Sequence, residues 1–226
     1  PDHLTIAHYR HYGGGDAALP YTLVPADDLL ERQRLVKDPD ELEAIRDAAR
    51  ITDGAFQHLL TRVAPGVTEQ ELALEAEWYM RRHGAAAAFD IIVAAGARGA
   101  LPHAQPGPRP LQPGDMVVVD LGAKVHHYCA DMTRTFAVAE AAPIAQEIYA
   151  VCRQAQHAGV AGIRAGMTGR EADAVVRRII DEAGYGPQFG HGTGHGVGLE
   201  IHEAPRVSRS NDAPMPVGAV ITVEPG

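Results

Sequence analysis

Two segments of this chain, one near its middle and one at its end, repeat the same pattern with an acid at the same place. Residues 113–122 read Pro-Gly-Asp-Met-Val-Val-Val-Asp-Leu-Gly, and residues 217–226 read Val-Gly-Ala-Val-Ile-Thr-Val-Glu-Pro-Gly. When the two are aligned on their glycines, Asp120 coincides with Glu224. An acid in an otherwise apolar strand costs free energy unless it is paired or binds a cation. Its repetition in register predicts a site built near a pseudo-two-fold axis.

The repeat extends upstream of these two segments. Residues 65–71 (Pro-Gly-Val-Thr-Glu-Gln-Glu) recur as residues 165–171 (Ala-Gly-Met-Thr-Gly-Arg-Glu). Each copy is a glycine turn followed by a capping box, in which a threonine precedes a glutamate by three residues. Each box predicts a helix, and the next glycine, Gly84 or Gly184, predicts where that helix ends. Capping boxes are common, so chance similarity is the alternative to duplication.

A further helix is predicted before each of these units. Asp38-Pro39-Asp40-Glu41 supplies an N-cap, a proline at the first helical position and a glutamate at the third. The matching helix of the second copy is expected to start near Pro143. Each half then contains two helices followed by strands, so the predicted fold class is α+β with two pseudo-symmetric αα-ββ halves.

Composition limits the classes of protein to which this chain can belong. It has 226 residues, of which 46% are hydrophobic, and a formal net charge of −9. The negative charge argues against a nucleic-acid surface and suits cationic ligands such as metal ions or peptide amino groups. Only two cysteines occur, Cys129 and Cys152, and neither a signal peptide nor a membrane span is apparent. A cytoplasmic protein without a nucleic-acid or membrane partner is therefore expected.

A second acid follows the first of the duplicated strands. Residues 116–119 are a continuous apolar run typical of a buried strand, and Asp131 follows Asp120 by eleven residues. A hairpin turning around Val125-His126 would place Asp120 opposite Asp131, with their Cβ atoms about 5 Å apart. Two carboxylates at that distance repel each other unless they share a proton, as in aspartic proteases, or a cation.

Three histidines in one glycine-rich segment favour the cation. Residues 191–203 read His-Gly-Thr-Gly-His-Gly-Val-Gly-Leu-Glu-Ile-His-Glu and contain His191, His195 and His202. The segment lacks the lysine of a phosphate-binding loop and the strand, glycine loop and helix order of a dinucleotide site. Imidazole and carboxylate ligands without a thiolate suit Mn, Co, Fe or Zn, and shared carboxylates suit two ions about 3.5–4 Å apart.

Together these motifs resemble the pita-bread metallopeptidase family, which includes aminopeptidase P, prolidase and methionine aminopeptidase. The resemblance runs from about Asp38 to Gly226. The matching segments are residues 101–104 (Leu-Pro-His-Ala), 120–123 (Asp-Leu-Gly-Ala), 128–136 (Tyr-Cys-Ala-Asp-Met-Thr-Arg-Thr-Phe), 191–198, 201–203 and 223–226 (Val-Glu-Pro-Gly). The Asp-Met-Thr-Arg-Thr string and the Gly-His-Gly-Val-Gly segment are similar to the proline-directed branch, that of Xaa-Pro aminopeptidase and prolidase. The resemblance implies the pita-bread (creatinase/aminopeptidase) fold around a curved antiparallel sheet.

The resemblance assigns four residues to two divalent metal ions. Asp120 would bind one ion, Asp131 would bridge both, and His195 and Glu224 would hold the second. Manganese is the foremost expected metal, with cobalt, zinc or iron as alternatives. A hydroxide between the ions would attack the peptide carbonyl.

The resemblance also assigns roles to three histidines. His103 and His202 are the implied catalytic histidines, and His202 would stabilise the oxygen of the tetrahedral intermediate. The implied substrate-binding residues are His103, His191 and His202.

The implied function is that of a metal-dependent exopeptidase, and the protein is expected to form a homodimer. It would hydrolyse the Xaa-Pro bond at the N-terminus of peptides or in dipeptides, and the choice between aminopeptidase and dipeptidase stays open. One alternative is a catalytically inactive homologue that acts as a binding or scaffold protein. Another is a metal-free hydrolase that resembles creatinase.

Two regions are expected along the chain. Residues 1–34 are interpreted as the remnant of an N-terminal domain or as an irregular extension. Residues 35–226 are interpreted as the catalytic domain, incomplete at its C-terminal end. The resemblance implies a fifth ligand, a bridging glutamate, which would follow residue 226.

Overall fold

The computed structural model describes residues 5–12 and 28–226. The chain divides into two units, residues 1–34 and residues 35–226. The first unit contains two short helices, α1 (Ile6–His11) and α2 (Leu29–Arg34). The expectation for residues 1–34 falls partly on residues 1–4 and 13–27, which lie outside the described residues.

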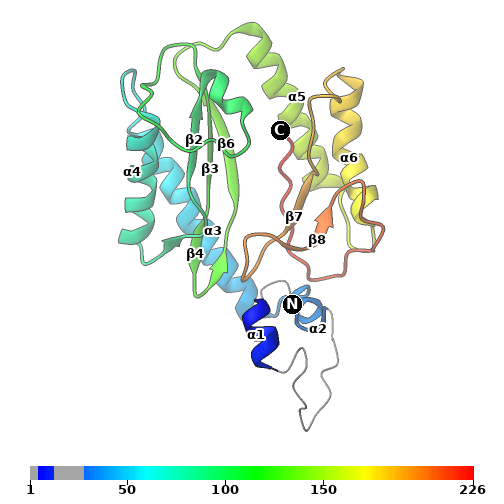
Figure 1. Cartoon of the computed structure of the whole chain (residues 1–226). Helices are drawn as coiled ribbons and strands as arrows, with labels where there is room; N and C mark the ends of the chain where they lie inside the picture. Colours follow the sequence, from blue (N-terminus) through cyan, green and yellow to red (C-terminus); the bar gives the residue numbers. More distant parts are fainter. Residues whose placement is uncertain (1–4, 13–27) are drawn as a thin grey trace. The chain divides into compact units, whose positions relative to one another are not determined.

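The second unit is built from two halves, and in each half a pair of helices precedes the strands (Figure 1). The first half contains α3 (Pro39–Leu60), α4 (Glu69–Arg82), β1 (Ala86–Ala87), β2 (Ile92–Ala95), the 3₁₀ helix η1 (Gly96–Ala100), β3 (Met116–Leu121), β4 (Ala123–Val125), β5 (Tyr128–Cys129) and β6 (Met132–Ala137). The second half contains α5 (Pro143–Gly162), α6 (Gly169–Glu182), β7 (Gly194–Gly196) and β8 (Glu203–Val207). Among the described residues, no helix is both long enough and apolar enough to cross a membrane.

Three of the long helices begin at the predicted side-chain caps. The Asp38 carboxylate accepts hydrogen bonds at 2.9 Å from the N–H groups of the second and third residues of α3. Thr68 and Thr168 each accept at 3.1 Å from the N–H of the glutamate three residues on, whose carboxylate accepts from the threonine N–H at 2.8 Å. These bonds satisfy donors that a helix start leaves without partners. The predicted glycine ends are also confirmed, because Gly84 and Gly184 have φ values of +81° and +86°.

The duplication is visible in the backbone hydrogen bonds as well. Gly66 donates its N–H to the carbonyl of Leu111 at 2.9 Å, and Gly166 donates to that of Met215 at 2.8 Å. The N-cap threonines of α4 and α6 each form an isolated β-bridge with a proline. Equivalent bonds at equivalent positions support duplication over chance similarity.

In the first half, α3 and α4 pack on an antiparallel sheet whose strand order is β2–β3–β6 (Figure 1). Exposure alternates along β3, since successive side chains of a strand face opposite sides. Val117, Val119 and Leu121 are buried in the main core with residues of both helices. Asp120 lies on the opposite face of β3, so its carboxylate points away from this core.

The hairpin that follows β3 turns later than predicted. The two residues at its tip, His126 and His127, both have positive φ, +48° and +73°. Two positive φ values are typical of a type I′ turn, which Asn-Gly usually marks and which His-His does not reveal in the sequence. The resulting register places Thr133 opposite Asp120. The predicted direct pairing of Asp120 with Asp131 is therefore wrong, although Asp131 stays close by at the start of β6.

The second copy of the duplicated strand is less regular than the first. Residues 217–226 were expected to repeat β3, but they form no continuous strand and bond mainly to the segment of β7. Thr222 donates its N–H to the carbonyl of His195 at 2.8 Å, and Glu224 donates to that of Thr193 at 2.9 Å. In the described chain β3 pairs continuously with β2 and β6, whereas this segment has separate backbone bonds to the β7 segment and one from the N–H of Lys37 to the Gly218 carbonyl at 3.2 Å. The pairing nevertheless brings Glu224 beside the segment that carries His195.

Candidate metal centre

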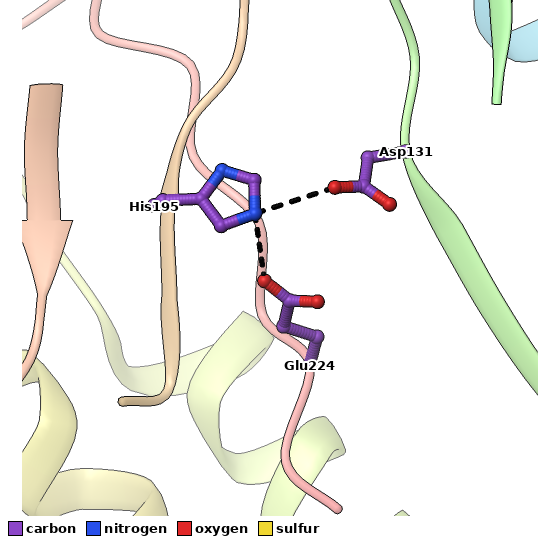
Figure 2. Close-up of side chains that lie close together, drawn as sticks. All are labelled: Asp131, His195 and Glu224. Carbon is purple, nitrogen blue, oxygen red and sulfur yellow. Dashed lines mark ion pairs between the residues drawn. The ribbon is translucent and has the colours of Figure 1, made fainter. Parts of the chain in front are cut away.

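Three side chains from separate parts of the second unit point toward one another (Figure 2). Asp131 lies between β5 and β6, His195 lies in β7, and Glu224 lies in the final segment beside β7. His195 Nε2 is 3.3 Å from Asp131 Oδ2 and 2.9 Å from Glu224 Oε1. The side chains of His195 and Asp131 are each 7% exposed, and that of Glu224 is 29% exposed. The centre is therefore largely withdrawn from water and most open at Glu224.

The donor set fits a divalent metal ion. One donor atom from each of the three residues lies within 4.8 Å of the other two. Ligands about 2.1 Å from a single ion lie about 3.0–3.4 Å apart in octahedral or tetrahedral geometry, which is close to the two separations from His195. One imidazole and two carboxylates without a thiolate suit Mn, Co, Fe or Zn.

The charges of the three groups stabilise one another. Burial lowers the pKa of His195, but hydrogen bonds to Asp131 and Glu224 outweigh burial and raise that pKa to about 10. Burial raises the pKa of Glu224, but the hydrogen bond from His195 outweighs burial and lowers it. His195 Nδ1 lies 2.9 Å from the carbonyl of Gly196, which directs Nε2 toward the acids. The protonated imidazole thus supplies positive charge where a metal ion would supply it.

Asp120 lies near this centre but outside the three-residue cluster. Its Oδ1 accepts a hydrogen bond from Thr133 Oγ1 at 3.0 Å. Burial, and then the charge of Asp131, raises the pKa of Asp120 to about 7. Burial and a neighbouring negative charge both disfavour the ionised form of a carboxyl. The structure brings three of the four predicted ligands together and places the fourth within electrostatic reach.

The three predicted histidines outside the ligand set differ in how closely they approach the centre. The ring of His202 packs edge-on against His195, with centroids 4.3 Å apart, and burial followed by the charge of His195 lowers the pKa of His202. The positive charge of His191 lies close enough to Glu224 to help lower the pKa of that carboxyl. His103 is exposed in the turn after η1, and within the described residues no hydrogen bond or ion pair joins it to the centre.

Two threonines that hold the acids were not predicted from the sequence. Thr133 donates to Asp120, as described above. Thr222 Oγ1 donates to Glu224 Oε1 at 2.8 Å and accepts the N–H of His195 at 3.0 Å. Thr222 lies two residues before Glu224 in an extended segment, and this spacing places the two side chains on the same face. Thr133 instead faces Asp120 across the β3–β6 pairing. The spacing could have identified Thr222, whereas Thr133 could be identified only from the strand register.

A comparison with known families accounts for this arrangement of residues. Residues 43–226, more than half of the chain, match the model of metallopeptidase family M24. The chain belongs to metallopeptidase family M24. The family predicted from the sequence motifs is thereby confirmed.

Known proteins are similar to this M24 chain over most of its length. A solved Xaa-Pro dipeptidase from Bacillus anthracis is 46% identical with a TM-score of 0.96, covering 99% of this chain and 62% of its own. An X-Pro aminopeptidase from Thermotoga maritima MSB8 is 39% identical with a TM-score of 0.91, and the match covers 99% of this chain and 63% of that protein. The Xaa-Pro dipeptidase of Pyrococcus furiosus is 42% identical over 201 residues, which are 88% of this chain and 58% of that protein. The pita-bread fold is confirmed, and the chain spans roughly three fifths of the length of these relatives.

Proposed function

We propose that this M24 chain carries the metal centre of an exopeptidase that hydrolyses Xaa-Pro bonds at the N-terminus of peptides or in dipeptides. The observation that carries the proposal is the convergence of His195 with Asp131 and Glu224 in a largely buried centre. Support for the substrate comes from similar proteins, which are named as Xaa-Pro dipeptidases and as an X-Pro aminopeptidase. The proposal therefore includes both dipeptides and longer peptides.

Two divalent metal ions would complete the site, with manganese foremost and cobalt, zinc or iron as alternatives. Asp131, His195 and Glu224 would hold one ion, and Asp120 would hold the other with Asp131 shared between them. Bound there, the ions would lower the pKa of water and polarise the peptide carbonyl. His195 and Asp120 must first give up their protons, because only neutral imidazole and ionised carboxylate bind a metal.

The histidines around the centre would act on the substrate. His202, whose ring lies against His195 and whose pKa is lowered, would donate a hydrogen bond to the carbonyl oxygen as that oxygen gains negative charge. His191, whose charge reaches Glu224, would contact the substrate near the scissile bond. His103 would contact the substrate from the exposed turn after η1.

We further infer that the protein acts as a homodimer in the cytoplasm, with residues 35–226 as its catalytic domain. The division of the chain after residue 34 supports that domain boundary. Cys129 and Cys152 are both free thiols, which suits a reducing compartment. The net charge of −9 disfavours a nucleic-acid partner. The homodimer rests on the family resemblance, and sedimentation equilibrium would test it.

The test is Mn²⁺ titration by calorimetry together with hydrolysis of an Xaa-Pro dipeptide and an Xaa-Pro-Xaa tripeptide. The Pyrococcus furiosus dipeptidase serves as the positive control, and His195→Ala serves as the ligand variant. In a chain that includes the bridging glutamate implied by the family resemblance, we expect binding of two ions and hydrolysis, both lost in His195→Ala. Folded protein that binds no Mn²⁺, Co²⁺ or Zn²⁺ would overturn the proposal. Binding without hydrolysis would instead favour a non-catalytic homologue.

A further inference from the structure

A buried ion pair on α6 lies outside the proposed ligand and substrate residues. Asp173 and Arg177 are one helical turn apart, and they are 1% and 6% exposed. Two hydrogen bonds join them, Arg177 Nε to Asp173 Oδ2 at 2.6 Å and Nη2 to Oδ1 at 3.0 Å. Burying two charges is costly even when they are paired, and a well-packed apolar pair is often as stable. Stability alone therefore does not account for this pair.

The remaining donors of Arg177 hold the backbone ahead of β7. Nη1 donates to the carbonyl of Phe189 at 3.0 Å, and Nη2 donates to the carbonyl of His191 at 2.6 Å. The guanidinium also lies over the ring of Phe189, 4.1 Å from its centroid. The planar guanidinium thus fixes two alternate carbonyls of the glycine-rich segment to one helix.

Asp173 holds the next part of the same segment. Its Oδ1 accepts the backbone N–H of Thr193 at 3.0 Å and the Thr193 hydroxyl at 2.9 Å. The carbonyl of Thr193 in turn accepts the N–H of Glu224 at 2.9 Å. A continuous chain of bonds therefore runs from α6 to the segments that carry His195 and Glu224.

We propose that Asp173 and Arg177 form an α6 clamp, a pair of positioning residues that sets the place of His191, His195 and Glu224. The clamp touches neither substrate nor metal; it acts through the backbone of residues 189–193. Glycines at 190, 192, 194 and 196 leave this segment few side-chain contacts of its own, so external bonds determine its path. The inference rests on the proposed function, since it takes His195 and Glu224 as ligands.

The first half provides a matched control. Glu69 of α4 is fully buried, pairs with Arg98, and accepts backbone N–H groups of Ala95 and Gly107 at 2.9 and 3.1 Å. It holds the loop of His103, and none of its hydrogen bonds or ion pairs in the described chain goes to residues 189–193. A Glu69→Gln variant therefore removes a buried charge of the same kind without touching the α6 clamp.

The test measures Mn²⁺ affinity by calorimetry and amide hydrogen exchange at Thr193 and Glu224. Asp173→Asn removes the charge, and Arg177→Lys keeps the charge but cannot bond two carbonyls and a carboxylate in one plane. We expect Mn²⁺ to bind 10- to 100-fold more weakly in both variants, the usual effect of losing an outer-shell partner. Both amides should exchange faster, while Glu69→Gln should leave affinity and exchange at these two amides unchanged.

Unchanged Mn²⁺ affinity and unchanged amide exchange in folded Arg177→Lys would overturn the clamp. If Asp173→Asn fails to fold, the result for Arg177→Lys alone decides. Equal losses of affinity in Glu69→Gln would also overturn it, because the effect would then be general destabilisation. If the unaltered chain binds no metal, the proposed function fails. The amide exchange rates at Thr193 and Glu224 in the variants would then test the clamp independently of metal binding.

Discussion

Metal binding should release protons, and their number follows from the charges at the centre. At pH 7.5 His195, with a pKa of about 10, is almost fully protonated, and Asp120, with a pKa of about 7, is about one quarter protonated. Both groups must lose their protons to bind cations, so these two side chains should release about 1.2 protons per chain on Mn²⁺ binding at pH 7.5, besides any proton lost by metal-bound water. At pH 6 Asp120 is about nine-tenths protonated, so the release should rise to about 1.9 protons.

The sign of the pH dependence follows from the same linkage. Because protons compete with the metal, the overall constant for binding both Mn²⁺ ions should rise with pH, by about 16-fold per pH unit near pH 7.5. Calorimetry in two buffers of different ionisation enthalpy measures the release directly. The slope of the observed enthalpy against the buffer ionisation enthalpy is the number of protons released.

Two variants make this measurement specific to the centre. His103→Ala should leave the count unchanged, because His103 lies in an exposed turn and has no bond to the centre within the described residues. Asp120→Asn has no proton to lose at this position, so its count at pH 6 should be about 0.9 protons lower than that of the unaltered chain. A count near zero at pH 7.5 that does not change with pH would refute the reasoning, since His195 would then not be an imidazolium held between Asp131 and Glu224.

Three predictions concern the fold. Thr68→Ala and Thr168→Ala remove equivalent caps, so urea denaturation should show each lowering the free energy of unfolding by about 1 kcal/mol, and clearly unequal losses would contradict the structural equivalence. Leu59→Ala, in the fully buried core, should lower it by about 2–5 kcal/mol in the same assay. The hydrogen bond from Arg109 lowers the pKa of Asp115, so its stabilisation is complete above about pH 4 and is lost as pH falls through the lowered pKa. Asp115→Asn should therefore flatten the acid limb of a stability-against-pH curve, and an unchanged limb would count against the pairing.

The helix starts and ends could be predicted because their causes are local. Asp38, Thr68 and Thr168 each bond to a group within three residues, and the φ angles of Gly84 and Gly184 depend on the absence of a side chain. The duplication was equally visible, since it repeats these local signals in the same order. Together with the acid and histidine motifs, they were enough to predict the family and the fold.

The register at the acids could not be predicted in the same way. One positive-φ pair in the His126-His127 turn shifts β6 against β3 and replaces Asp131 by Thr133 opposite Asp120. A shift in register changes every cross-strand neighbour, and no residue near the turn signals it.

The sequence by itself determined where the acids and histidines stand, where the four long helices begin, and that the chain is built from two similar halves. The motifs already implied that Asp131, His195 and Glu224 meet, and the tertiary structure gave their separations; it alone decided that Asp120 stays with Thr133 and that His103 remains exposed. It also decided that Asp173 and Arg177 hold the glycine-rich segment. The physical reason is the sequence separation between partners. The hydrogen-bonding groups of caps and turns find partners within a few residues, whereas a buried charge is paired with whichever segment packs beside it.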